Sequence, residues 1–155
     1  MEILRSTVTE SLSHALVVGI NDNQLCRDGW HERAVDGRSG ILYRPMAAEA
    51  TFQLALPGGD LEIVALVSAS TTLCGGLMKA HLLLDENPLA KTILDTENWV
   101  IRRFPLKQAR AGLHLFKWIV EDTFIPNDVL KNGDFRKMGL YMACVRVQKT
   151  DSQGD

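Results

Sequence analysis

The chain has 155 residues, of which 46% are hydrophobic and 23% are charged, and its formal net charge is −2. This length and composition predict one globular domain with a hydrophobic core of its own. The near-neutral charge excludes the basic surface of a nucleic-acid-binding protein, and no apolar run approaches the roughly 18 residues of a membrane-spanning helix.

The two ends of the chain differ from its middle. Residues 1–12 are ambiguous between an extra strand and an unstructured lead, and residues 149–155 form a polar tail that we expect to be flexible. Residues 13–148 show no linker, repeat or change of composition, so we assign them to one β-sandwich domain. The N-terminus lacks the pattern of a secretory signal peptide, and the three scattered cysteines suit a reducing compartment, so we expect a cytoplasmic protein.

Apolar residues alternate along most of the chain, as they do in strands that bury one face. In residues 49–56, Phe52 and Leu54 share a face, and a Pro-Gly-Gly-Asp turn then leads into the next extended run, which predicts a β-hairpin. Residues 139–148 have two apolar faces, which is typical of a central strand covered on both sides. The expected strands are residues 15–20, 40–44, 49–56, 61–68, 77–84, 98–104, 113–120 and 139–148.

Two segments favour short helical turns, residues 89–96 and residues 127–131. Neither is long enough to cross over between parallel strands. We therefore predict an all-β fold, namely a jelly-roll-like antiparallel β-sandwich of about eight strands with one or two short helical turns.

The sequence contains none of the common catalytic or cofactor-binding motifs. There is no P-loop, no GxSxG elbow, no HExxH pair and no dinucleotide-binding glycine pattern. The four histidines lack metal-ligand spacing, and the paired carboxylates lie at expected strand ends. We therefore expect no catalytic residue, no metal and no cofactor, and a protein that is not an enzyme.

An aromatic and charged cluster early in the chain is the best candidate for a ligand site. Aromatic rings stack on the apolar C–H face of a pyranose, and neighbouring charged groups hydrogen-bond its hydroxyls. In a structural alternative, Glu32 pairs with Arg44 across the first strands while Trp30 caps one end of the core. The predicted ligand-binding residues are Trp30, His31, Glu32, Tyr43 and Arg44.

A second segment, residues 124–140, favours a structured loop before the last strand. Gly133 permits a positive φ, and Asp134 and Arg136 can tie the loop to the sheet. The functional alternative is a cation or hydroxyl site that uses Asp128 and Asp134. A calcium loop would normally supply more oxygen ligands at closer spacing, which favours the structural interpretation.

Three motifs stand in an order that has a counterpart in a known family: Gly29-Trp30-His31-Glu32, then Tyr43-Arg44, then residues 126–139 with the pattern PNDV…GDFRKMG. In these motifs the chain resembles the jelly-roll accessory domains attached to bacterial glycosyltransferases and polysaccharide-processing proteins, over about residues 16–147. Val129 and Met138 stand where leucine is usual. Such domains look like carbohydrate-binding modules, so the resemblance implies a glycan ligand and a glycosyltransferase partner.

We therefore predict a non-catalytic, carbohydrate-binding-like accessory module linked to bacterial polysaccharide or glycan metabolism. The alternative is a protein-interaction or scaffold sandwich without a sugar site, which docks on a glycosyltransferase or self-associates. Exposed sheet edges make a homodimer compatible with either hypothesis. A small hydrolase or isomerase on a β-sandwich is a third hypothesis, and it requires a concave pocket that holds titratable groups of perturbed pKa. No nucleic-acid or membrane partner is expected.

Overall fold

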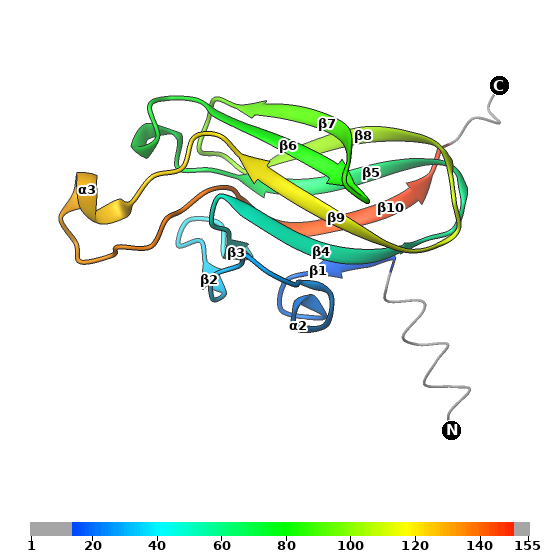
Figure 1. Ribbon diagram of the computed structural model, residues 1–155. Coiled ribbons are helices and arrows are strands. Elements are labelled where there is room, and N and C mark those ends of the chain that lie inside the picture. Colours follow the sequence, from blue (N-terminus) through cyan, green and yellow to red (C-terminus); the bar gives the residue numbers. More distant parts are fainter. Residues whose placement is uncertain (1–13, 151–155) are drawn as a thin grey trace.

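The computed structural model describes residues 14–150, so the predicted lead at residues 1–12 and the tail beyond residue 150 lie outside the described residues. Two antiparallel β-sheets lie face to face and enclose the hydrophobic core (Figure 1), which confirms the predicted jelly-roll-like β-sandwich. Ten strands are described, where about eight were expected. None of the helices in this part of the chain has the length and apolar character needed to cross a bilayer.

The larger sheet has six strands, with β10 at its centre. On one side, β10 pairs with β5, and β8 forms the outer edge beyond β5. On the other side, β3 pairs with the first two residues of β10, and β1 pairs with the residues that follow. The strands of this sheet are β2 (Ala34–Val35), β3 (Leu42–Pro45), β10 (Tyr141–Lys149), β5 (Gly59–Ser68), β8 (Val100–Ala109) and β1 (Ala15–Val17).

The smaller sheet has four strands in the order β4-β9-β6-β7. Two short helices and one 3₁₀ turn lie in the connections between strands. The bounds are β4 (Glu49–Leu56), β9 (Gly112–Val120), β6 (Met78–Leu84), β7 (Asn87–Leu94), α2 (Asp22–Leu25), α3 (Pro126–Leu130) and η1 (Thr71–Leu73).

The core lies between the sheets and follows the period of two expected for strands. Phe52 and Leu54 of β4 are buried, as the alternation predicts, and so are Phe116 and Trp118 of β9. The rings of Phe52 and Phe116 stack at a centroid distance of 5.1 Å with an interplanar angle of 7°. Burial of each such large side chain contributes about 1.5–3 kcal/mol to the driving force for folding.

The helical turn expected at residues 89–96 is wrong, because residues 87–94 form β7. Asp85 and Glu86 adopt positive φ values of 49° and 74°, and this two-residue turn folds β7 back onto β6. Pro88 is tolerated there because β7 lies at the edge of its sheet, where a missing N–H breaks no ladder. The other expected turn, at residues 127–131, is confirmed as α3.

Residues 139–148 were expected to form a central strand, and β10 confirms this position. Apolar residues occur at both even and odd positions of this segment because a bulge changes which positions face the core. A register shift between Met142 and Cys144 inserts one residue into the strand. Leu140 and Met142 face the core before this bulge, and Val145 faces it afterwards. The core-facing side therefore passes from even to odd positions within one strand.

Candidate functional site

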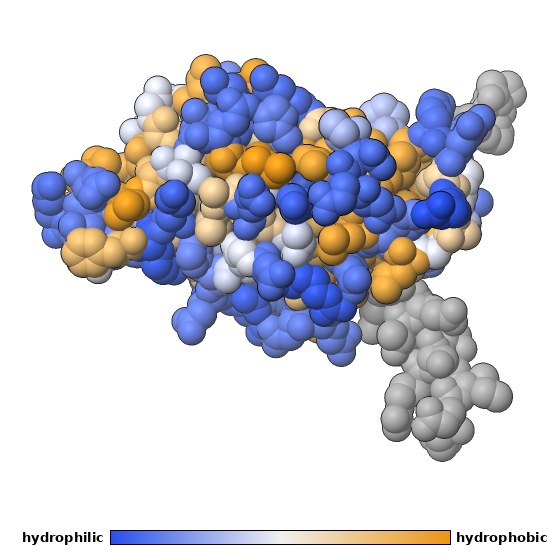
Figure 2. Space-filling view, viewed as in Figure 1, coloured by the Kyte–Doolittle hydropathy of each residue, from blue (hydrophilic) through white to orange (hydrophobic). Residues whose placement is uncertain are grey.

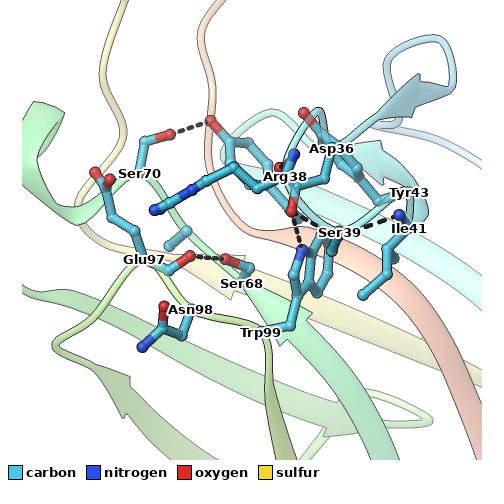
Figure 3. Close-up of a pocket in the computed structure, with 12 residues that line it drawn as sticks. Asp36, Arg38, Ser39, Ile41, Tyr43, Ser68, Ser70, Glu97, Asn98 and Trp99 are labelled. Carbon is cyan, nitrogen blue, oxygen red and sulfur yellow. Dashed lines mark hydrogen bonds between the residues drawn. The ribbon is translucent and has the colours of Figure 1, made fainter.

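At one end of the sandwich, the outer face of the six-stranded sheet is hollowed into a pocket of ≈ 490 Å³, which we call the aromatic pocket (Figure 3). The loop between β2 and β3, the segment after β5 and the segment before β8 contribute its walls. This volume lies within the range of small-ligand sites in proteins, about 300–1,000 Å³.

Three aromatic side chains form one side of the aromatic pocket. The ring centroid of Tyr43 is 5.4 Å from that of Trp99 and 5.0 Å from that of Tyr141, with interplanar angles of 59° and 41°. Their neighbours Met142 and Val100 pack into the core, so strand alternation turns Tyr141 and Trp99 to the outer face. The inclined rings present apolar surface in several directions.

Asp36 fixes the β2–β3 loop against these rings. Its Oδ2 accepts hydrogen bonds from Nε1 of Trp99 at 2.9 Å and from the hydroxyl of Ser39 at 2.7 Å. Its Oδ1 accepts a third from the backbone N–H of Arg38 at 3.3 Å. The hydrogen bonds from Ser39 and Trp99 lower the pKa of Asp36, so this carboxylate stays ionised and positions the loop.

The opposite side of the pocket is polar. Oε2 of Glu97 accepts hydrogen bonds from the hydroxyl and the backbone N–H of Thr72, at 2.5 and 3.2 Å. The hydroxyl of Ser70 lies 2.6 Å from that of Tyr141. Figure 3 shows Arg38 reaching across the pocket toward Ser70 and Glu97. Within residues 14–150, its guanidinium forms no hydrogen bond or ion pair, so its donors are available to a ligand.

Burial raises the pKa of Tyr43, and it raises the pKa of Tyr141 to about 12. Both phenols therefore stay neutral and can donate hydrogen bonds at ordinary pH. The aromatic pocket thus combines apolar ring surface with neutral hydroxyls, an uncommitted guanidinium and an exposed carboxylate. Such a combination fits a ligand that has one apolar face and a rim of hydroxyl groups.

Tyr43 is the one of the five predicted ligand residues that lines the aromatic pocket. Trp30 lies half-buried against β4, where its Nε1 donates a hydrogen bond to the backbone oxygen of Thr51 at 2.7 Å and its ring centroid is 6.5 Å from that of Phe52. Glu32 is exposed. Trp30 thus packs against the core, as the structural alternative expects.

His31 joins the early cluster to the segment that precedes β10. Its Nε2 lies 2.8 Å from the backbone oxygen of Lys137, an acceptor to which the ring can only donate. This contact links positions more than a hundred residues apart in the sequence.

Arg44 belongs to a buried ionic network and does not pair with Glu32. Its Nε lies 2.6 Å from Oδ2 of Asp22, and Arg33 contacts the same carboxylate at 2.9 and 3.0 Å. Asp22 is 0% exposed. Burial alone would raise its pKa, but the hydrogen bonds from Arg33 and Arg44 outweigh that effect and lower the pKa of Asp22 to about 2.

The second predicted segment contains an internal clasp. Both side-chain oxygens of Asp134 accept hydrogen bonds from Arg136, at 2.9 and 2.7 Å, and this lowers the pKa of Asp134 to about 2. Asp128 is exposed on α3. In the part of the chain that the structure describes, no three His, Cys, Asp or Glu side chains are grouped so that they could hold a metal ion.

Sequence reasoning did not identify Asp36, Glu97, Trp99 or Tyr141 as site residues. The sequence contains only a weak indication of these residues. Trp99 and Tyr141 each stand at the start of an extended run, and the first residues of a strand lie at an end of the sandwich. Their proximity to Tyr43 depends on the pairing of β3 and β8 with the central strands, and the sequence does not give strand order.

No family model and no curated protein matches the chain. Solved structures do match it. A family 35 carbohydrate-binding module from an environmental isolate has a TM-score of 0.52 at 9% identity over 81% of this chain and 93% of its own. A CBM36 carbohydrate-binding module in complex with calcium and xylotriose has a TM-score of 0.51 at 10% identity over 79% and 93%.

The chain also matches part of a longer enzyme. A family GH115 4-O-methyl-α-glucuronidase with specificity for decorated arabinogalactans has a TM-score of 0.51 at 12% identity, and the match spans 81% of this chain but only 16% of that one. At these identities the likeness concerns the fold. The chain therefore has the jelly-roll β-sandwich fold that is also found in carbohydrate-binding modules.

Proposed function

We propose that this protein is a non-catalytic carbohydrate-binding module whose ligand occupies the aromatic pocket. The observation that carries the proposal is the group of three inclined aromatic rings beside the uncommitted guanidinium of Arg38 and other polar side chains at one end of the sandwich. The shared fold with carbohydrate-binding modules and the sequence resemblance support it independently.

Each part of the pocket has a defined role in this proposal. Trp99 and Tyr43 supply apolar surface for the C–H face of a sugar ring. Arg38, Glu97 and Asn98 line the same pocket and supply donors and acceptors for its hydroxyls. Trp30, His31, Glu32 and Arg44 belong to the fold rather than to the ligand site in this assignment.

The state of the carboxylates favours binding over catalysis. Asp36 stays ionised and already accepts three hydrogen bonds, so it is poorly suited to donate a proton as a general acid. Glu97 is an exposed side chain that accepts hydrogen bonds from Thr72, and it is not buried as a general acid usually is.

Two features of the sheet edges weigh against the scaffold alternative. The β4 edge is covered, because the N–H of Arg27 donates to the oxygen of Thr51 and the N–H of Thr51 donates to the oxygen of Asp28. Pro88 in β7 and Pro105 in β8 interrupt the exposed edges of the two sheets. A role beside a bacterial glycosyltransferase is part of the proposal, and it rests on the sequence resemblance.

A glycan array that compares the wild-type protein with Trp99→Ala tests the proposal. We expect the wild type to bind one class of oligosaccharide and Trp99→Ala to lose at least tenfold in affinity, because the variant lacks both a stacking surface and the hydrogen bond that holds Asp36. If the wild type is folded and binds no glycan, the proposal is wrong.

Two control variants separate the aromatic pocket from its surroundings. Ile101→Ala removes an exposed apolar side chain two residues from Trp99 and should leave binding unchanged. Glu32→Ala changes an exposed member of the early cluster and should also bind normally. Loss of binding in Glu32→Ala but not in Trp99→Ala would transfer the site to the cluster around Trp30.

A further inference from the structure

The connection between β9 and β10, residues 121–140, projects from the same end of the sandwich as the β2–β3 loop and carries α3 (Figure 1). We call this connection the arm. Phe124 and Met138 pair across its base, and His31 donates to the backbone of Lys137 beside that pair. The arm is therefore anchored to the body of the molecule at both of its ends.

The polar groups of the arm bond mainly to one another. The backbone N–H of Asn127 donates to the oxygen of Asp134 at 2.8 Å, and the side-chain oxygen of Asn127 accepts from the N–H of Gly133 at 2.8 Å. The Asp134–Arg136 clasp closes the same turn. Because these bonds fix the backbone, the tip of the arm has a defined shape before any ligand binds.

Large apolar residues point outward from this fixed turn. Phe135 is 70% exposed, and Val129 and Leu130 on α3 are also exposed. Figure 2 shows hydrophobic residues among hydrophilic ones on this arm, at the left of the view. Because the backbone that carries Phe135 is already fixed, little backbone entropy is lost when a ligand stacks on the exposed ring, which makes it an effective contact surface.

The arm leads directly into the aromatic pocket, because its last residue, Leu140, precedes Tyr141, which lines the pocket. Arg136, the neighbour of Phe135, acts through its positive charge on both Tyr43 and Tyr141, where it partly offsets the rise in pKa that burial causes. Phe135 stands between Asp134 and Arg136 in the sequence, and the side chains of these two neighbours pair with each other. An exposed ring held beside the pocket by this turn offers apolar surface on which a sugar unit can stack.

We propose that Phe135 forms a second sugar subsite and that the protein binds an oligosaccharide chain, one part of which lies in the aromatic pocket and a neighbouring part on the arm. The inference rests on the proposed function of the aromatic pocket. It adds that affinity increases with chain length and that this increase depends on Phe135.

A length series tests this inference. Xylose, xylotriose and xylohexaose, and the corresponding glucose and galactose series, are titrated by calorimetry into the wild-type protein, Phe135→Ala and Phe135→Trp, together with any longer series that the array identifies. We expect the wild type to gain about tenfold in affinity from the shortest to the longest member of the series that binds. Phe135→Ala should lose that gain and keep the affinity for the shortest member, and Phe135→Trp should retain the gain.

Ile20→Ala is the matched control, because Ile20 is also an apolar residue that is 70% exposed. Equal affinity of all chain lengths for the wild type, or an unchanged length dependence in Phe135→Ala, would overturn the second subsite while leaving the aromatic pocket intact. If the wild type is a dimer, and Phe135→Ala makes it monomeric without altering glycan affinity, the second subsite is wrong and Phe135 serves self-association instead. If no glycan binds to any variant, the proposed function and this inference fail together.

Discussion

Replacement of Asp22 by Asn tests whether the buried ionic network holds the first segments of the chain onto the sandwich. Asp22 is 0% exposed and receives hydrogen bonds from Arg33, from Arg44 and from the backbone N–H of Gly19 at 2.9 Å. The variant keeps the size of the side chain but removes its charge, and its amide group would direct N–H donors toward a guanidinium. Loss of one partner from a buried pair costs several kcal/mol when both groups are fully desolvated.

The magnitude follows from the pKa of Asp22. A fall from 3.8 to about 2 on folding corresponds to about 2.5 kcal/mol of stability, at about 1.4 kcal/mol per pKa unit. Arg33 is partly open to solvent, which reduces the value, so we expect Asp22→Asn to lower the free energy of unfolding by about 2 kcal/mol. The folded-state pKa is depressed, so this stabilisation is complete above about pH 4 and is lost as the pH falls toward 2.

Urea denaturation between pH 7 and pH 2.5, followed by circular dichroism, measures this effect. The wild type should lose stability in that acid range, and Asp22→Asn should be less stable at pH 7 and show a flatter dependence on pH. Asp95→Asn, which changes an exposed carboxylate, is the control and should behave as the wild type. Equal stability of Asp22→Asn and the wild type at pH 7 would refute the role assigned to the network.

Two further substitutions test local features of the fold. Gly29→Ala should destabilise the protein by more than about 2 kcal/mol in a urea melt, because Gly29 has a φ of +91° and an added Cβ would lie 1.9 Å from the backbone oxygen of Glu49. His114→Leu should lower the free energy of unfolding by about 2 kcal/mol in the same assay. His114 is 6% exposed, and its ring nitrogens lie 2.5 Å from the carboxylate of Asp85 and 2.7 Å from the backbone oxygen of Arg110. Leucine would leave both of these acceptors without their hydrogen-bond partner. A stability within 0.5 kcal/mol of the wild type, on the order of a neutral surface change, would contradict either assignment.

The alternation of apolar residues was enough to predict the fold class, because burial between two sheets imposes a period of two on each strand. Phe52 and Leu54 show this directly, since both face the core as the pattern indicates. The pattern failed where another constraint was stronger. Residues 89–96 look helical in isolation, but the positive φ values of Asp85 and Glu86 turn them back as an edge strand.

The ligand site was harder to predict because it depends on strand order. Tyr43 could be named from its local context, whereas Trp99 and Tyr141 join it only through pairing across the six-stranded sheet. The prediction that the Gly29-Trp30 motif belongs to a ligand site likewise lacked information on which strands lie beside it. Its residues are distinctive because Gly29 approaches β4 closely and Trp30 packs on it, contacts that no local pattern reveals.

The tryptophans of the chain permit a direct test of where a glycan binds. The chain has three, and their indole N–H groups occupy different environments: Trp99 donates to Asp36 in the aromatic pocket, Trp30 donates to Thr51, and Trp118 is buried in the core. Each gives its own indole signal in a proton–nitrogen NMR spectrum. The decisive measurement is a titration of the labelled protein with the oligosaccharide that binds best on the array. We predict that the Trp99 signal shifts progressively while those of Trp30 and Trp118 stay in place. A shift of the Trp30 signal with an unmoved Trp99 signal would contradict the assignment of the aromatic pocket as the ligand site.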